Sequence, residues 1–188
     1  SQNRPEWVIA DLSILSLGAV VVPIYPTLSS QEIAYILNDS ECKVVFVETG
    51  NHVAAIKAEK HQLSFFKKAI VMDFVELTDS DFVHFHFGSA KPSTSVDVCD
   101  VRRQDCASIV YTSGTTGNPK GVVLNHDHFL SNLEDIKEAI PISDQDVLLS
   151  FLPLSHTFER TTGYYYPLLQ GASIYYAENV NTVTRDLL

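Results

Sequence analysis

The sequence predicts an α/β fold in which helices and strands form layers around mainly parallel sheets. Short apolar runs of strand length alternate with longer segments whose apolar residues recur at helical spacing. Hydrophobic residues make up 45% of the 188 residues and charged residues 19%, which is a globular composition with enough apolar material for a core. No segment is repeated or of low complexity, and the length fits one domain or a large part of one.

The first two expected helices have clear beginnings. Pro5 can occupy the first turn of a helix that ends at Gly18, and apolar residues on most of its sides predict that this helix is buried. The second helix is expected over residues 30–37, because Ser29 and Glu32 have the spacing of a capping box in front of it.

Strands and helices alternate along the rest of the chain. Runs rich in Val, Ile, Phe and Tyr predict strands at residues 20–24, 43–47, 68–72, 83–87, 121–124, 147–152 and 172–176. Two further helices are expected at residues 51–60 and 126–140, and Asn125 caps the second of them. A cluster of Gly, Ser, Pro and Thr at residues 88–95 predicts a connecting loop.

A helix is also expected over residues 156–170. Ser155 can cap its N-terminus, and Gly171 can end it in the left-handed conformation that glycine adopts without strain. Gly163 and Pro167 are unfavourable inside such a helix and argue against a regular one.

Charge and cysteine content restrict the kinds of partner. The net charge of −10 argues against a nucleic-acid binder, because that function needs a basic face. The three cysteines, Cys42, Cys99 and Cys106, are odd in number and show no Cys-x-x-Cys spacing, which predicts reduced thiols in a cytoplasmic setting.

The sequence does not predict a membrane span. The longest apolar stretch, residues 14–25, is interrupted by Ser16, Gly18 and Pro23 and is too short to cross a bilayer. No basic amphipathic helix is evident, so at most a peripheral contact with a membrane surface is expected.

The segment most informative about function is residues 111–121, YTSGTTGNPKG. It combines four small hydroxyl residues, three glycines and one lysine, which are listed here: Thr112, Ser113, Thr115, Thr116, Gly114, Gly117, Gly121 and Lys120. Glycines let the backbone approach a ligand closely, hydroxyls and bare amides can donate to phosphate oxygens, and a lysine adds a point charge. The composition and spacing therefore predict a phosphate-binding loop; a flexible hairpin of small residues is the alternative.

This loop differs from the P-loop of nucleotide triphosphatases. That motif ends in Gly-Lys-Ser/Thr at the start of a helix. Here Lys120 follows Pro119 and precedes an apolar run of strand type, so no helix N-terminus stands behind the phosphates. A phosphoryl-transfer enzyme of the kinase type is disfavoured for the same reason and because no acidic magnesium motif accompanies the loop.

Two segments together resemble a known family. Residues 111–121 resemble the phosphate-loop signature of the adenylate-forming (AMP-binding) superfamily, which includes acyl-CoA synthetases, luciferases and peptide-synthetase adenylation domains. Residues 151–160, FLPLSHTFER, resemble its next signature, and the Phe-Glu-Arg ending is most similar to long-chain fatty acyl-CoA synthetases. Residues 3–7 and 18–27 are also similar to the early part of those enzymes.

The resemblance implies a two-step ligase. A fatty acid carboxylate attacks the α-phosphate of ATP, giving acyl-AMP and pyrophosphate, and the thiol of coenzyme A then attacks the acyl-adenylate. The first step brings two anions together, so positioning and charge neutralisation must supply most of the rate gain.

The resemblance also assigns roles to individual residues. It implies that Ser113, Gly114, Thr115, Thr116 and Gly117 bind the β- and γ-phosphates of ATP. It further implies that Thr112 provides an oxygen ligand to Mg²⁺, that Lys120 neutralises the phosphates, and that His156 lies near the acyl carboxylate and the α-phosphate. Lys120 and His156 are the expected catalytic residues.

The resemblance places residues 1–188 within the N-terminal AMP-binding domain, truncated at both ends. Members of the family carry further groups downstream: a Tyr-Gly-x-Thr-Glu segment whose glutamate helps hold Mg²⁺, a ribose-binding aspartate, and a C-terminal lid domain with a catalytic lysine. None of these is present in the chain, so this segment alone is not expected to turn over.

Two other functions remain open at this point. One is a different adenylate-forming ligase, which activates an aryl or amino acid. The other is a nucleotide-binding module without catalysis.

Several other residues have more than one interpretation. His84 and His86, and the cluster of His126, Asp127 and His128, have spacings compatible with a metal site, but ordinary polar positions on a strand face and in a first helical turn are favoured. Phe158 and Arg160 are expected either to line an acyl channel or to serve, respectively, in core packing and in a surface ion pair.

Overall fold

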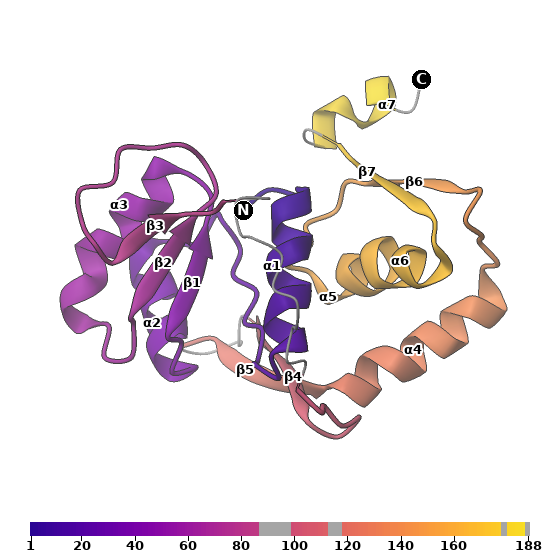
Figure 1. Ribbon diagram of the computed structural model, residues 1–188, viewed down its shortest axis with the longest axis horizontal. Coiled ribbons are helices and arrows are strands. Elements are labelled where there is room, and N and C mark those ends of the chain that lie inside the picture. The colour runs from indigo at the N-terminus through magenta and orange to yellow at the C-terminus, as the bar shows by residue number, and fades with distance from the viewer. Residues whose placement is uncertain (87–98, 113–117, 178–179, 187–188) are drawn as a thin grey trace, which may run out of the picture.

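The computed structural model describes residues 1–86, 99–112, 118–177 and 180–186. They form an α/β arrangement with three small sheets (Figure 1). The first sheet holds the parallel strands β1 (Val44–Val47), β2 (Lys68–Val71) and β3 (Phe82–His84). β4 (Cys106–Thr112) and β5 (Lys120–Asn125) form an antiparallel pair, and β6 (Val147–Ser150) and β7 (Ser173–Tyr176) form a parallel one.

Helices connect and cover these strands. Their bounds are α1 (Pro5–Ser16), α2 (Ser30–Asp39), α3 (Gly50–Glu59), α4 (His126–Ala139), α5 (Thr157–Glu159), α6 (Tyr166–Gln170) and α7 (Val183–Asp186). Short 3₁₀ segments follow α3 at Lys60–Gln62 and precede α7 at Val180–Thr182. None of the helices in the described ranges is long and apolar enough to cross a membrane.

The parallel sheet β1–β2–β3 has its own hydrophobic core. Helix α2 begins with the expected capping box, in which the Ser29 side chain accepts from the Glu32 amide and the Glu32 carboxylate accepts from the Ser29 amide. The apolar faces of α2 and α3 pack with the strands in one cluster: Ile33, Ala34, Leu37, Val47, Val53, Ile56, Leu63, Ala69, Val71 and Phe82. Burial of these side chains supplies the main stabilisation of this half of the molecule.

The second half contains the hairpin β4–β5, the pair β6–β7 and the helices α1, α4 and α6 (Figure 1). Asn125 caps α4 as expected, because its side chain accepts from the His128 amide. The predicted helix over residues 156–170 exists as three consecutive pieces: α5, a π-helical segment at Arg160–Tyr165, and α6. Gly171 ends α6 with a φ of 77°, in the left-handed conformation that was expected.

Three expectations about local structure are wrong. Residues 20–24 form no strand; Val21 makes a single bridge to Ser108 of β4, and Pro23 has no N–H with which to extend the ladder. The N-cap of α5 is His156 rather than Ser155, because the chain enters helical geometry one residue later than expected. Helix α1 is not buried on most sides, since Leu12 and Ser13 are exposed and the deeply buried residues are Ala10 and Asp11.

Candidate functional site

The predicted phosphate loop connects two paired strands. In the antiparallel register Thr112, the last residue of β4, lies opposite Lys120, the first residue of β5. The five predicted phosphate-binding residues Ser113, Gly114, Thr115, Thr116 and Gly117 lie outside the described residues. The structure therefore brings together the two ends of the loop, and the roles of its five central residues remain a prediction.

A glycine lets the hairpin pack closely next to the loop. Gly121 pairs with Tyr111 across the hairpin. A Cβ atom at position 121 would lie 2.7 Å from Cγ2 of Ile109 and 3.2 Å from Cζ of Tyr111, which is closer than side-chain atoms normally approach. The glycine therefore lets the Ile109 and Tyr111 side chains lie directly over β5.

Tyr111 joins the hairpin to the other half of the molecule. Its hydroxyl donates to the Asp39 carboxylate at the end of α2, with an O–O distance of 2.6 Å. Burial and the neighbouring Asp39 carboxylate raise the pKa of Tyr111, so the phenol stays protonated and keeps donating at neutral pH. The Tyr35 ring packs edge-on against the Tyr111 ring at a centroid distance of 6.5 Å. The strand that carries Thr112 is thus fixed at the preceding residue, Tyr111.

Lys120 and Thr112 are exposed at the open end of this hairpin. Within the described ranges no ion pair involves Lys120. An exposed ammonium group next to an exposed hydroxyl can meet an incoming anion without first breaking an internal salt bridge. This arrangement is consistent with the predicted phosphate-binding role of Lys120.

His156 presents one ring nitrogen to solvent. Its Nδ1 atom accepts a hydrogen bond from the Phe158 amide at 3.2 Å, and the residue is exposed. A neutral imidazole that accepts at Nδ1 must carry its proton on Nε2. His156 can therefore offer an Nε2–H donor outside the helix N-terminus, which is the group needed next to a developing negative charge.

The turn before His156 is held by Asn3 and by a buried carboxylate. Asn3 donates through Nδ2 to the Ser150 hydroxyl and to the Leu152 carbonyl, and its Oδ1 accepts from the Leu154 amide. The Ser150 hydroxyl in turn donates to Oε1 of Glu159 at 2.6 Å. These bonds connect the N-terminal segment, the end of β6 and the first turn after His156.

Glu159 is 5% exposed, and burial raises the pKa of its carboxyl group, opposed by the hydrogen bond from Ser150. A Cβ atom at position 163 would lie 2.5 Å from Oε1 of Glu159. Gly163 therefore leaves the room that this carboxylate occupies within the helix. That requirement explains a glycine that sequence reasoning regarded only as a helix breaker.

Arg160 is buried and paired, which corrects the expected surface ion pair. The side chain is 1% exposed, and its NH2 atom lies 2.5 Å from Oδ1 of Asp11, which is 2% exposed. Its NH1 atom donates to the Ser108 hydroxyl at 2.8 Å, and the Tyr165 hydroxyl donates to Oδ2 of Asp11. Three ring centroids lie within 5.2–5.7 Å of Arg160 Cζ: Phe129, Tyr165 and Trp7.

Phe158, by contrast, is 59% exposed, so the expectation of core packing is wrong. The neighbouring Glu159 and Arg160 point inward and occupy the polar interior, which leaves Phe158 on the outer side of the turn. A role for Phe158 in an acyl channel stays a prediction.

Sequence reasoning missed Asp11, Ser108 and Glu159. Asp11 is an acidic residue in a helix that is otherwise largely apolar, and charged residues are almost never buried unless paired. That pattern signals a buried partner, but its identity could not be inferred, because Asp11 and Arg160 are 149 residues apart.

The histidine pairs form no metal site in the part of the chain that is described. His84 and His86 have ring centroids 6.1 Å apart, and no group of three or more metal-binding side chains occurs there. His128 accepts from the Asn125 amide through Nδ1, and Asp127 pairs with Arg103 at 2.5 Å. The three cysteines are free thiols, as expected.

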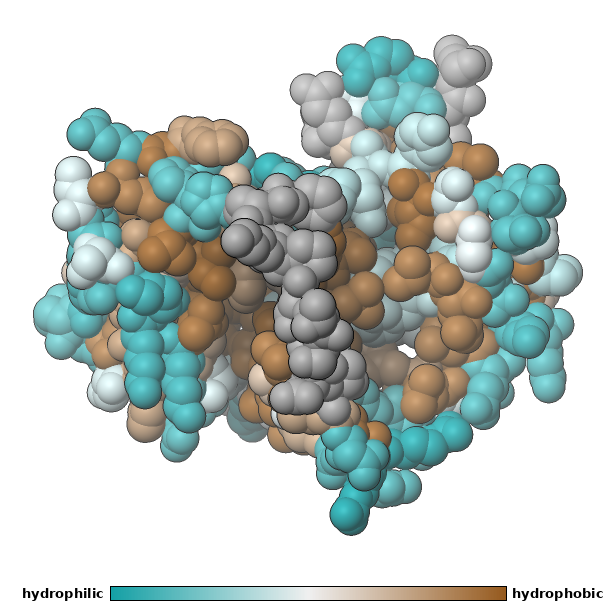
Figure 2. Space-filling model, viewed as in Figure 1, coloured by the Kyte–Doolittle hydropathy of each residue, from teal (hydrophilic) through white to brown (hydrophobic). Residues whose placement is uncertain are grey.

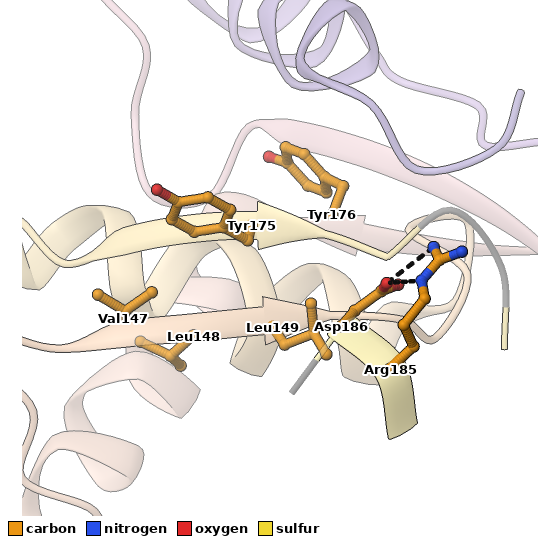
Figure 3. Close-up of a pocket in the computed structure, with 7 residues that line it drawn as sticks. All are labelled: Val147, Leu148, Leu149, Tyr175, Tyr176, Arg185 and Asp186. Carbon is orange, nitrogen blue, oxygen red and sulfur yellow. Dashed lines mark hydrogen bonds and ion pairs between the residues drawn. The ribbon is translucent and has the colours of Figure 1, made fainter. Parts of the chain in front are cut away.

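A cavity of about 620 Å³ lies away from the predicted site residues, between β6, β7 and α7 (Figure 3). Its lining is Val147, Leu148, Leu149, Tyr175, Tyr176, Arg185 and Asp186. Neither Thr112, Lys120 nor His156 contributes to it. Size alone therefore does not make this cavity the candidate site.

Comparisons with known proteins show which family the whole sequence matches. The family described as "AMP-binding enzyme" matches residues 1–188. Human long-chain-fatty-acid–CoA ligase 1 is 35% identical over 176 residues, a match that covers 85% of this chain and 25% of that protein. The chain thus spans about a quarter of the length of the curated relatives it matches.

Solved structures show the same fold. The anthranilate CoA ligase AuaEII in complex with anthranoyl-AMP superposes with a TM-score of 0.83 at 23% identity, covering 100% of this chain and 36% of that one. ATP-bound MatB from Rhodopseudomonas palustris superposes with a TM-score of 0.80 at 25% identity, again over 100% of this chain and 36% of that one. The expected α/β fold of acyl-CoA synthetase type is confirmed.

Proposed function

Because this chain belongs to the AMP-binding enzyme family, we propose that it is part of an ATP-dependent ligase that activates a long-chain fatty acid as acyl-AMP and transfers it to coenzyme A. The observation that carries the proposal is the hairpin that places Thr112 opposite Lys120 at the two ends of the YTSGTTGNPKG segment. The relatives that are 33–35% identical and are named long-chain-fatty-acid–CoA ligases support the acyl substrate.

In this proposal the hairpin binds the triphosphate of ATP. Ser113, Gly114, Thr115, Thr116 and Gly117 surround the β- and γ-phosphates. Lys120, which is exposed and has no ion pair in the described ranges, partly neutralises the negative charge of the leaving pyrophosphate.

The proposal includes a bound Mg²⁺, which prefers oxygen ligands. The exposed hydroxyl of Thr112 would be one such ligand, and the ion would neutralise phosphate charge when bound. The protein itself supplies position: Tyr111 and Ser108 hold β4, so that the hydroxyl and the ammonium group meet the nucleotide without rearrangement.

His156 acts at the reacting end of the nucleotide. Its Nε2–H donor would steady the negative charge that develops as the carboxylate oxygen attacks the α-phosphate. A donor that is already oriented costs no reorganisation at the moment of reaction, and Asn3 and Glu159 provide that orientation through the turn and the helix that follow β6.

The test is pyrophosphate exchange into ATP by the full-length protein. Palmitate, anthranilate and malonate serve as a panel of long-chain, aryl and short dicarboxylic acids. We expect exchange that depends on palmitate and exceeds that with either other acid. Exchange with anthranilate or malonate alone would identify an aryl or a dicarboxylic acid as the substrate in place of a fatty acid. If no acid supports exchange although calorimetry shows that ATP binds, a non-catalytic nucleotide-binding module is favoured.

A further inference from the structure

Arg160 lies where three separate parts of the chain meet. Its guanidinium contacts Asp11 on α1 and Ser108 on β4, while its own backbone belongs to the helix that follows His156. The Ser108 hydroxyl also donates to the Val21 carbonyl at 2.7 Å, so the extended segment beside β4 is linked to the same group of hydrogen bonds. One side chain therefore holds together residues that are far apart in sequence.

Both predicted catalytic regions are connected to this side chain, His156 through the backbone and the phosphate-loop strand through Ser108. The Arg160 amide donates to the His156 carbonyl at 3.0 Å, so Arg160 closes the turn that begins at His156. Ser108 precedes Thr112 by four residues of the same strand, which is about 13 Å at ~3.3 Å per residue. A displacement of Arg160 would change the position of His156 relative to the phosphate-loop strand.

Stability alone is a poor explanation for such a group. Replacing a buried ion pair by well-packed apolar residues is often neutral or stabilising, whereas a guanidinium imposes two directed bonds from a rigid plane. The two bonds here run in different directions, one to Oδ1 of Asp11 and one to the Ser108 hydroxyl. Three aromatic rings restrict the guanidinium further. The two directed bonds and the three rings hold the guanidinium in one position and orientation.

We propose that Arg160 is a positioning residue that sets the distance between His156 and the β4–β5 phosphate hairpin, through Ser108 on one side and the His156 turn on the other. The inference rests on the proposed function, since it assigns to Arg160 the alignment of that reaction. The Phe-Glu-Arg ending of the second signature then has a physical role: Glu159 fixes the turn to β6, and Arg160 fixes it to β4 and α1.

The first test uses two variants of the full-length protein. Ser108→Ala removes the contact to β4 and leaves the Asp11–Arg160 pair, and Arg160→Lys keeps the charge but loses the two-pronged geometry. We expect the kcat for fatty acid-dependent adenylation to fall roughly tenfold to a hundredfold in both, while the KM for ATP changes less than about twofold. Val71→Ala, a core truncation in the β1–β3 sheet, is the control that lowers stability without this loss.

A second readout does not depend on turnover. Hydrogen exchange of the backbone amides is measured for residues 108–112 and 156–160 in the same full-length proteins. We expect exchange in both segments to rise together in Ser108→Ala and Arg160→Lys, and in neither segment in Val71→Ala.

The two arms separate this inference from the proposed function. Unchanged kcat in an active protein, or exchange that rises in only one of the two segments, overturns the positioning role. If the wild-type protein activates none of the acids, the proposed function fails, and the exchange measurement still decides whether Arg160 couples the two segments.

Discussion

At the scale of single residues, the candidate site depends on exposed side chains that form no ion pair with any residue the structure describes. Lys120 and Thr112 are exposed and lie opposite each other, and His156 uses one ring nitrogen internally and keeps the other available. The residues that support them, by contrast, each form a hydrogen bond within the protein: Tyr111, Ser108 and Glu159. Supporting groups that are fixed by packing and hydrogen bonds are a usual requirement of a preorganised site.

Replacing Lys120 by alanine tests the phosphate contact directly. Charge-assisted hydrogen bonds contribute about 1.5–3 kcal/mol, so Lys120→Ala should lower kcat/KM for ATP in the full-length protein by roughly tenfold to a hundredfold. Because the side chain is exposed, the melting temperature should change little.

Lys137→Ala on α4, which also removes an exposed lysine, is the matched control in the same kinetic assay. Kinetics unchanged by Lys120→Ala would show that the ammonium group does not contact the nucleotide.

At the scale of elements, the helix after β6 is irregular next to a buried carboxylate. The π-helical segment at Arg160–Tyr165 begins next to Glu159 and contains Gly163, whose missing side chain makes room for that carboxylate. Single π-turns are frequent at functional sites, since they reorient side chains within a helix. Here the reoriented group is Arg160, which faces α1 and β4.

Glu159→Gln tests the protonation of this carboxylate. Its folded-state pKa is raised above the ordinary value of 4.5, mainly by burial. The contribution of this group to the stability of the folded state is therefore fully present below about pH 4.5. It is lost as the pH rises through the folded-state pKa, where the buried group must ionise. The variant keeps the acceptor for Ser150 and does not titrate, so its melting temperature should rise relative to that of the wild type as the pH increases above about 4.5.

Thermal unfolding of the full-length proteins across that pH range measures the difference. Glu134→Gln, at an exposed position on α4, is the control for removal of a carboxylate as such. A difference between Glu159→Gln and wild type that stays constant with pH would mean that the buried carboxylate does not titrate in this range.

Elements with local signals could be predicted, and elements defined by distant partners could not. The caps of α2 and α4 involve residues three positions apart, so their sequences specify them. Residues 20–24 have the composition of a strand, but their pairing depends on how β4 lies beside them, and only Val21 makes it. For the site, the sequence predicted that Lys120 lies at the start of a strand, as it does in β5, whereas the network of Asp11, Ser108 and Arg160 joins residues too far apart in sequence to be inferred.

At the scale of the whole molecule, the main hydrophobic cluster and the predicted catalytic residues lie in different halves. The β1–β3 sheet with α2 and α3 holds the main apolar cluster, and none of the predicted catalytic residues belongs to it. The half with α1, β4–β7, α4 and α6 carries the hairpin, His156 and the buried polar network. In that half, apolar side chains are also exposed over α4 and α6, among them Leu130 and Leu169 (Figure 2).

Val71→Ala tests this division. Val71 is 0% exposed in the central strand β2, and truncating a buried aliphatic side chain of this size should lower the free energy of unfolding by about 2 kcal/mol. Urea unfolding measures that loss, and kcat of the full-length protein should stay within about twofold of wild type. A parallel fall in kcat would show that this sheet takes part in aligning the site.

The pairing of Thr112 with Lys120 also limits how the intervening segment can vary in length. Residues 113–119 join two strands whose register is set elsewhere, by Gly121 against Tyr111 and by Ser108 against Val21. One inserted or deleted residue that was absorbed by sliding β5 would turn Lys120 to the opposite face of the hairpin, because successive strand side chains alternate. Surface connections usually tolerate such changes, but a change of this kind would separate the Thr112 hydroxyl from the Lys120 ammonium group.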